Sequence, residues 1–138
     1  MEFFSGEEDK MIANLTKKRY VACNPWFARR FYHRLRGMIG RKFSNFDAMV
    51  FENCNAVHTL FTEIDLDLIF VNSNCQVVKV CSNVKPWRVV YSCRKACLVI
   101  ELPSGMAARS KTEVGDILNL TMNSLPECQI SSSIVPNL

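Results

Sequence analysis

Residues 66–81, with the sequence LDLIFVNSNCQVVKVC, hold two short apolar runs separated by a polar turn. Leu66 to Val71 and Val77 to Cys81 are rich in branched and aromatic side chains, which suit the pleated surface of a strand. Asn72 to Cys75 lie between the two runs. Asparagine tolerates the left-handed backbone conformation that tight turns require. The stretch therefore predicts an antiparallel β-hairpin.

Similar short runs continue on both sides of this hairpin, and each one ends at Asn, Ser, Pro or Gly residues. They predict further strands at Arg19 to Cys23, Ala48 to Phe51, Ala56 to Phe61, Val89 to Tyr91, Leu98 to Leu102 and near Ile117 to Leu120. Met106 to Ser110 predicts a short helical turn. Closely spaced strands with few helices favour a mainly β fold of the α+β class, a compact antiparallel β-sandwich or barrel.

One amphipathic basic helix is predicted near residues 25–37. Asn24 suits the N-cap, Pro25 suits the first helical position, and Gly37 suits a left-handed C-terminal cap. Apolar side chains recur here with the helical period, and basic ones fall on the opposite face. The apolar positions are Phe27, Phe31, Leu35 and Met38, and the basic ones are Arg29, His33 and Arg36.

The chain has 138 residues, of which 49% are hydrophobic and 22% are charged, a balance typical of one domain with its own core. We expect an acidic flexible segment at 1–13, a β-rich domain at 14–120 and a poorly ordered tail at 121–138. No apolar run approaches the roughly 20 residues of a membrane helix. The acidic start does not resemble a secretory signal, so we expect a cytoplasmic protein.

The seven cysteines are odd in number and form no C-x-x-C pair. Most of them lie inside apolar runs, which favours free cysteines in a reducing compartment. Together with two histidines they lack the spacing of a zinc site, and Cys93 and Cys97 come within reach of one ion only in a turn. We therefore expect no metal and no cofactor.

The absence of glycine-rich phosphate loops and of a G-x-S-x-G motif excludes the commonest nucleotide-binding and hydrolase signatures.

The net charge of +4 is unevenly distributed. Residues 1–9 carry −4, residues 10–42 carry +10 and contain no acid, and residues 43–138 carry −2. The basic segment makes nucleic acid or an anionic surface one possible partner of the predicted helix. The alternative is that its arginines pair with acidic side chains elsewhere in the domain. Such ion pairs would join Arg29, Arg36 or Arg41 to Glu63, Asp65, Asp67 or Glu101.

Six short motifs occur together in a fixed order along the chain. They are RLRGMIGRK at 34–42, CNAVHTLF at 54–61, DLIFV at 67–71, KPWR at 85–88, IELPSG at 100–105 and VGD at 114–116. In this order and spacing the chain resembles an uncharacterised prokaryotic family called domain of unknown function 192, over about Asn14 to Asp116. The resemblance implies a compact β-rich domain. It implies no activity, because the family has none assigned.

Departures from the family pattern fall between two of these motifs. Thr62 stands where the family usually has methionine, and Glu63 and Asp65 stand where it has a basic residue and a proline. Two added carboxylates change the charge of that loop, so a ligand shared with the family is not implied.

His58 and Asp67 are the candidate catalytic residues. If the strands Ala56 to Phe61 and Leu66 to Val71 are neighbours, a cross-strand pair places an imidazole beside a carboxylate that fixes its tautomer. The alternative is that Asp67 binds a turn and His58 packs at the sheet edge. Cys54 and His58 also suggest a nucleophile and base, but four residues along a strand separate them by ~13 Å.

Lys85, Trp87 and Arg88 place an aromatic ring between two cations, a combination that stacks on planar groups or meets acidic partners. The alternative is that Trp87 covers the core while both cations stay solvated. We expect the ligand-binding residues to be Arg36, His58, Asp67, Trp87 and Arg88. The favoured function is a non-enzymatic module that binds a protein or a small molecule. The alternatives are a hydrolase-like or transferase-like enzyme that uses His58 and Asp67, and a nucleic-acid binder.

Overall fold

The strands and the helix of the domain lie within the part of the chain that the computed structural model describes, residues 11–28, 38, 42–60, 62–88 and 91–122. The elements are β1 (Met11–Asn14), β2 (Arg19–Ala22), β3 (Pro25–Phe27), β4 (Ala48–Glu52), β5 (Ala56–Val57), β6 (Leu66–Val71), β7 (Val77–Val84), β8 (Tyr91–Ser92), β9 (Leu98–Pro103), α2 (Met106–Arg109) and β10 (Leu118–Met122). The predicted mainly β, single-domain fold is confirmed.

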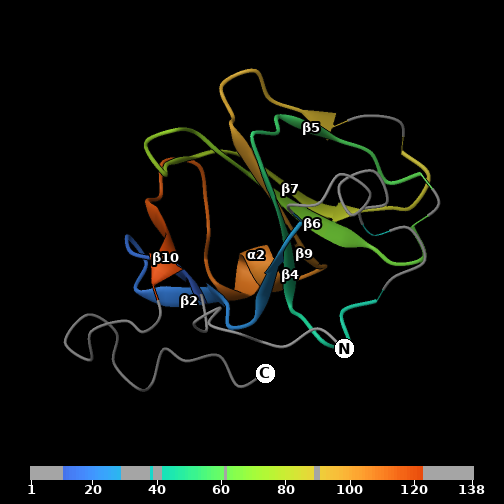
Figure 1. Cartoon of the computed structure of the whole chain (residues 1–138), viewed down its shortest axis with the longest axis horizontal. Coiled ribbons are helices and arrows are strands. Elements are labelled where there is room, and N and C mark those ends of the chain that lie inside the picture. The colour runs from blue at the N-terminus through green and yellow to red at the C-terminus, as the bar shows by residue number, and fades with distance from the viewer. Residues whose placement is uncertain (1–10, 29–37, 39–41, 61, 89–90, 123–138) are drawn as a thin grey trace.

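A three-stranded sheet, ordered β10-β1-β2, and a five-stranded sheet, ordered β3-β4-β9-β6-β7, form a sandwich, and β5 and β8 form a separate two-stranded sheet. β3 and β4 are parallel, and the other pairs are antiparallel. Figure 1 shows β2 and β10 on one side of α2 and the five-stranded sheet on the other. One core cluster joins the sheets, with Ile12 and Val21 from one, Ile69 and Ile100 from the other, and Met106 from α2.

The second core cluster lies on the opposite face of the five-stranded sheet. Along β6, Ile69 faces the first cluster, whereas Leu68 and Phe70 face the second. Trp26 of the edge strand β3 packs against this second cluster, and segments outside the sheet cover it with Phe43, Phe46, Val57 and Ile64. Because both faces are covered, all six residues of β6 are buried. This explains why the strand is an uninterrupted apolar run apart from one aspartate.

The hairpin predicted from residues 66–81 is confirmed, because β6 and β7 pair antiparallel. Cys75 has the left-handed φ of 59° that the turn requires. The Asn72 side chain accepts the backbone N–H groups of Asn74 and Gln76, both at 3.0 Å. A local turn signal therefore fixed this part of the fold.

Two predictions need correction. Among the described residues of the run Ala56 to Phe61, which exclude Phe61, only Ala56–Val57 form a strand, and this strand pairs with β8 rather than with β6. The predicted helix near 25–37 does not begin at Pro25, because Pro25–Phe27 form β3 beside β4. Residues 29–37 of that prediction lie outside the described part of the chain.

Candidate functional site

Thr59 is a buried residue that fixes the turn at 85–88. Its hydroxyl donates to the carbonyl of Lys85 at 2.8 Å and accepts the backbone N–H of Arg88 at 2.9 Å. Its carbonyl accepts the N–H of Trp87 at 2.7 Å, and its own N–H donates to the carbonyl of Arg88 at 3.1 Å. These bonds clamp the turn against the segment after β5. Thr59 lies inside the motif CNAVHTLF at 54–61, but that pattern does not indicate that its hydroxyl bonds to a turn 26 residues further along the chain.

The clamped turn carries an exposed aromatic residue in an unusual conformation. Trp87 has a φ of 67° and its side chain is 59% exposed. A left-handed φ is strained for a bulky residue and persists only when the surrounding structure enforces it. Lys85 and Arg88 on the same turn are also exposed. We call Lys85, Trp87 and Arg88 the tryptophan turn.

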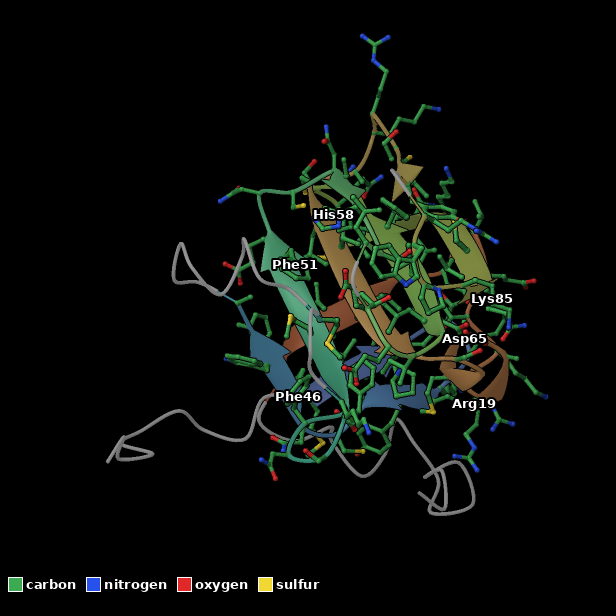
Figure 2. The ribbon with its side chains drawn as sticks, turned by 90° about the vertical axis from the view of Figure 1, so that its right-hand side faces the viewer. Arg19, Phe46, Phe51, His58, Asp65 and Lys85 are labelled. Carbon is green, nitrogen blue, oxygen red and sulfur yellow. The ribbon has the colours of Figure 1, made fainter. Side chains whose placement is uncertain are left out.

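His58 is the chain neighbour of Thr59 and is exposed. Its Nδ1 accepts the backbone N–H of Leu60 at 3.2 Å, so that nitrogen is the unprotonated one when the ring is neutral. The Lys85 ammonium forms an ion pair with Asp65. Figure 2 shows Lys85 and Asp65 together at one edge and His58 apart from them in that view. Asp65, one of the carboxylates added to this loop, thus meets a cation of the tryptophan turn.

Asp67 lies elsewhere, in the core between the sheets, with 0% of its surface exposed. Its Oδ1 accepts the N–H of Asn83 at 2.9 Å, and its Oδ2 accepts the N–H groups of Gly105 at 3.0 Å and Ala107 at 2.8 Å. The carboxylate thus binds the first turn of α2. We expected His58 and Asp67 to meet across two neighbouring strands. This expectation is wrong about the strands, because β6 pairs with β7 and β9.

Glu101 is a second buried carboxyl group, on the middle strand of the five-stranded sheet, with 3% of its surface exposed. Met49 and Leu68 are its direct neighbours on the adjacent strands. Burial raises its pKa to about 8. Among the described residues its Oε2 has no hydrogen-bond partner. The predicted partners Arg29, Arg36 and Arg41 lie outside the described part of the chain, so that pairing stays a prediction.

Asp116 belongs to a third polar cluster, which ties the segment before β10 to β1. Its carboxylate accepts the Asn14 side chain at 2.8 Å, the Lys17 ammonium at 2.9 Å and the backbone N–H of Glu113 at 3.0 Å. Burial alone would raise the pKa of Asp116, but the hydrogen bonds from Asn14 and Lys17 lower it below its ordinary value. Every contact in this cluster joins parts of the fold, so we assign it to the scaffold.

The described residues contain no group of three or more His, Cys, Asp or Glu side chains that could hold a metal ion. Over the same residues, no helix is long and apolar enough to cross a membrane.

Arg36, which we expected in the site, lies outside the described residues, so the structure places only four of the five predicted ligand-binding residues. It bonds Trp87 and Arg88 to Thr59, the chain neighbour of His58, and sets Asp67 apart in the core.

Comparison with known proteins agrees with the resemblance seen in the motifs. The model of the DUF192 family, described as Uncharacterized ACR, matches residues 13–120. The chain belongs to this family. A UPF0127 protein of Pyrococcus furiosus is 36% identical over 111 residues, which cover 78% of this DUF192 chain and 95% of that protein. A UPF0127 protein of Pyrococcus horikoshii is 38% identical over 61 residues, covering 44% of this chain and 52% of that protein.

Solved structures share the fold of this DUF192 chain. A protein of unknown function from Novosphingobium aromaticivorans superposes with a TM-score of 0.67 and 20% identity, covering 80% of this chain and 82% of that one. A second structure, from Sinorhizobium meliloti, has a TM-score of 0.66 and 18% identity, covering 80% of this chain and 91% of that one. At these identities the likeness is one of fold alone.

Proposed function

We propose that this chain is a non-enzymatic binding module whose ligand or partner docks on the tryptophan turn and the neighbouring His58. The observation that carries the proposal is the exposed Trp87, which the bonds to Thr59 hold at a left-handed φ of 67°. A strained backbone with an exposed aromatic side chain is costly for a purely structural turn. It is useful where a ring must be presented to another molecule in a fixed orientation.

The chemistry of the turn favours an anionic partner that carries a planar or apolar group. The indole stacks on a planar group, and the Arg88 guanidinium binds carboxylate or phosphate through two parallel hydrogen bonds. Lys85 adds a second cation, although Asp65 already neutralises part of its charge. Small molecules and acidic segments of proteins both offer this combination.

The contacts of Asp67 support binding rather than acid–base catalysis. A general base needs an orienting group within hydrogen-bond distance, and both oxygens of Asp67 are occupied by backbone N–H groups. His58 in turn uses Nδ1 for the backbone of Leu60. The enzymatic alternative would therefore need a different orienting group for His58.

A thermal-shift screen tests the proposal. The purified chain is heated with mononucleotides, aromatic carboxylates, aliphatic dicarboxylates and acidic peptides of defined sequence. We expect at least one aromatic anion to raise the melting temperature, since a ligand that binds only the folded state stabilises it. The shift should disappear in Trp87→Ala and shrink in Arg88→Gln.

Arg109→Gln serves as the matched control, because Arg109 is an exposed arginine on α2. This variant removes the same charge from another part of the surface and should keep the full shift. A ligand whose shift survives Trp87→Ala, or is lost equally in Arg109→Gln, binds elsewhere and contradicts the proposal.

A further inference from the structure

Cys54 and Cys97 lie opposite each other where the β4 and β9 pair ends. The last regular pair is Glu52 with Leu98, and Asn53 then takes a left-handed φ of 51°. The N–H of Cys54 donates to the carbonyl of Cys97 at 3.0 Å. Both cysteines lie just beyond the paired strands, and this bond joins the two segments one step past the last regular pair. Opposed residues of an antiparallel pair have Cα atoms ~5 Å apart, a separation that a disulfide spans.

Both cysteines contribute to the wall of one open hollow. Its volume is about 420 Å³, and it is lined by Asn53, Cys54, Asn55, Ala56, Ala96 and Cys97. The Cys54 thiol donates to the carbonyl of Ala56 at 3.1 Å and is half-buried. The hollow has the size of a small-molecule site. The two thiols therefore share a space that a small reagent can enter.

Cys97 is the more accessible of the two. It is exposed, whereas the other described free cysteines are only partly accessible. Its backbone is fixed from a second side, because its N–H donates to the carbonyl of Val71 at 2.9 Å. The preceding turn carries Arg94 and Lys95, both exposed. These two cations attract anionic reagents to the surface beside Cys97.

We propose that Cys97 and Cys54 form a thiol modification site that reacts with anionic low-molecular-weight disulfides. The Cys97 thiolate attacks one sulfur of the small disulfide, forming a mixed disulfide and releasing one small thiolate, which takes up the proton that Cys97 lost. The Cys54 thiol then loses its proton to solvent and attacks the Cys97 sulfur. This step forms the Cys54–Cys97 bond, breaks the mixed disulfide and releases the second small thiolate, which takes up a proton from solvent. The small disulfide is reduced and the two protein thiols are oxidised.

The experiment uses the full chain and oxidised glutathione. After brief exposure, the remaining free thiols are alkylated. The wild type should then carry alkyl groups on five of its seven cysteines, and the other two should have lost one hydrogen each. Peptide mapping should join the peptide that contains Cys54 to the peptide that contains Cys97. Cys54→Ser should stop at a glutathione adduct on Cys97, and Cys97→Ser should form neither product at these positions. Cys23→Ser, at a half-buried cysteine of another segment, should behave like the wild type.

Arg94 and Lys95 are tested with a matched pair of reagents. Replacing both Arg94 and Lys95 by glutamine should slow the reaction with oxidised glutathione severalfold and leave the reaction with uncharged hydroxyethyl disulfide unchanged. A first adduct on another cysteine in Cys54→Ser, or a wild-type link that excludes Cys54 or Cys97, overturns the proposal. So does a folded wild type that does not react while the same chain reacts in denaturant. None of these outcomes depends on the tryptophan turn.

Discussion

The carboxylate of Asp67 on β6 accepts the backbone N–H of Ala107 on α2 at 2.8 Å, forty residues further along the chain. The same oxygen accepts the N–H of Gly105, so one side chain holds both the start of α2 and the turn before it. Charge-assisted bonds of this kind are stronger than neutral ones, and they satisfy N–H groups that a helix leaves free. We therefore assign Asp67 to the scaffold.

Asp67→Asn should lower the free energy of unfolding by about 2–4 kcal/mol, because an amide nitrogen then faces backbone N–H groups or leaves them unsatisfied. His58→Ala should change it by less than about 0.5 kcal/mol, since the imidazole is exposed. Urea denaturation with an unchanged slope measures both values. Equal effects of the two substitutions would contradict the separation of these residues and revive the catalytic pair.

The contrast between Asp67 and the hairpin indicates what this sequence can predict. The β6–β7 hairpin follows from local signals, namely two apolar runs and an asparagine turn. The role of Asp67 depends on backbone groups sixteen to forty residues away, which no local pattern describes. The motif DLIFV gave its position in a strand but could not say that its carboxylate binds α2.

The same distinction explains the two errors in secondary structure. Asn24 and Pro25 are typical of a helix start, but Pro25–Phe27 pair in parallel with residues 48–50 of β4, a contact across more than twenty residues. Tertiary pairing therefore overrode a local capping signal. The run after Ala56 has strand-forming residues, but Thr59 bonds to the turn at 85–88 and ends the strand early.

Glu101 makes stability depend on pH. Its pKa is about 8 in the folded protein and near its ordinary value of 4.5 in the unfolded chain, so the folded state holds one more proton between these values. The contribution of Glu101 to the free energy of unfolding is fully present below about pH 4.5. It is lost as the pH rises towards about 8, by at most ~1.4 kcal/mol per pH unit.

Glu101→Gln keeps the shape of the side chain and cannot ionise. The difference in unfolding free energy between the variant and the wild type should therefore grow from about pH 5 to about pH 8 and then level off. Thermal melts in a buffer series measure this difference. Parallel curves for the two proteins would mean that Glu101 is ionised in the folded state, paired with a cation such as those of the basic segment.

Substitutions of Trp87 should affect ligand binding and the stability of the fold differently. Glycine adopts a left-handed φ without strain, so Trp87→Gly should keep the melting temperature or raise it by the equivalent of about 1 kcal/mol. Trp87→Ala retains the strain and should melt below the glycine variant. Both variants should lose the thermal shift given by an aromatic anion. If both variants melt well below the wild type, the indole stabilises the fold, which removes the main argument for the tryptophan turn as a docking surface. A glycine variant that melts below the alanine variant would contradict the strain at this position.

Thr59 tests whether the turn must be held rigid to bind. Thr59→Val has nearly the same shape but loses the hydroxyl that joins the Lys85 carbonyl to the Arg88 N–H, which should cost about 1–3 kcal/mol. Hydrogen exchange at the Arg88 amide should accelerate, and the affinity for the same ligand should fall although Trp87 and Arg88 are unchanged. Thr59→Ser keeps the hydroxyl and serves as the control. If the valine variant exchanges faster and still binds with wild-type affinity, the ligand does not need the preformed turn, and the strain at Trp87 has another cause.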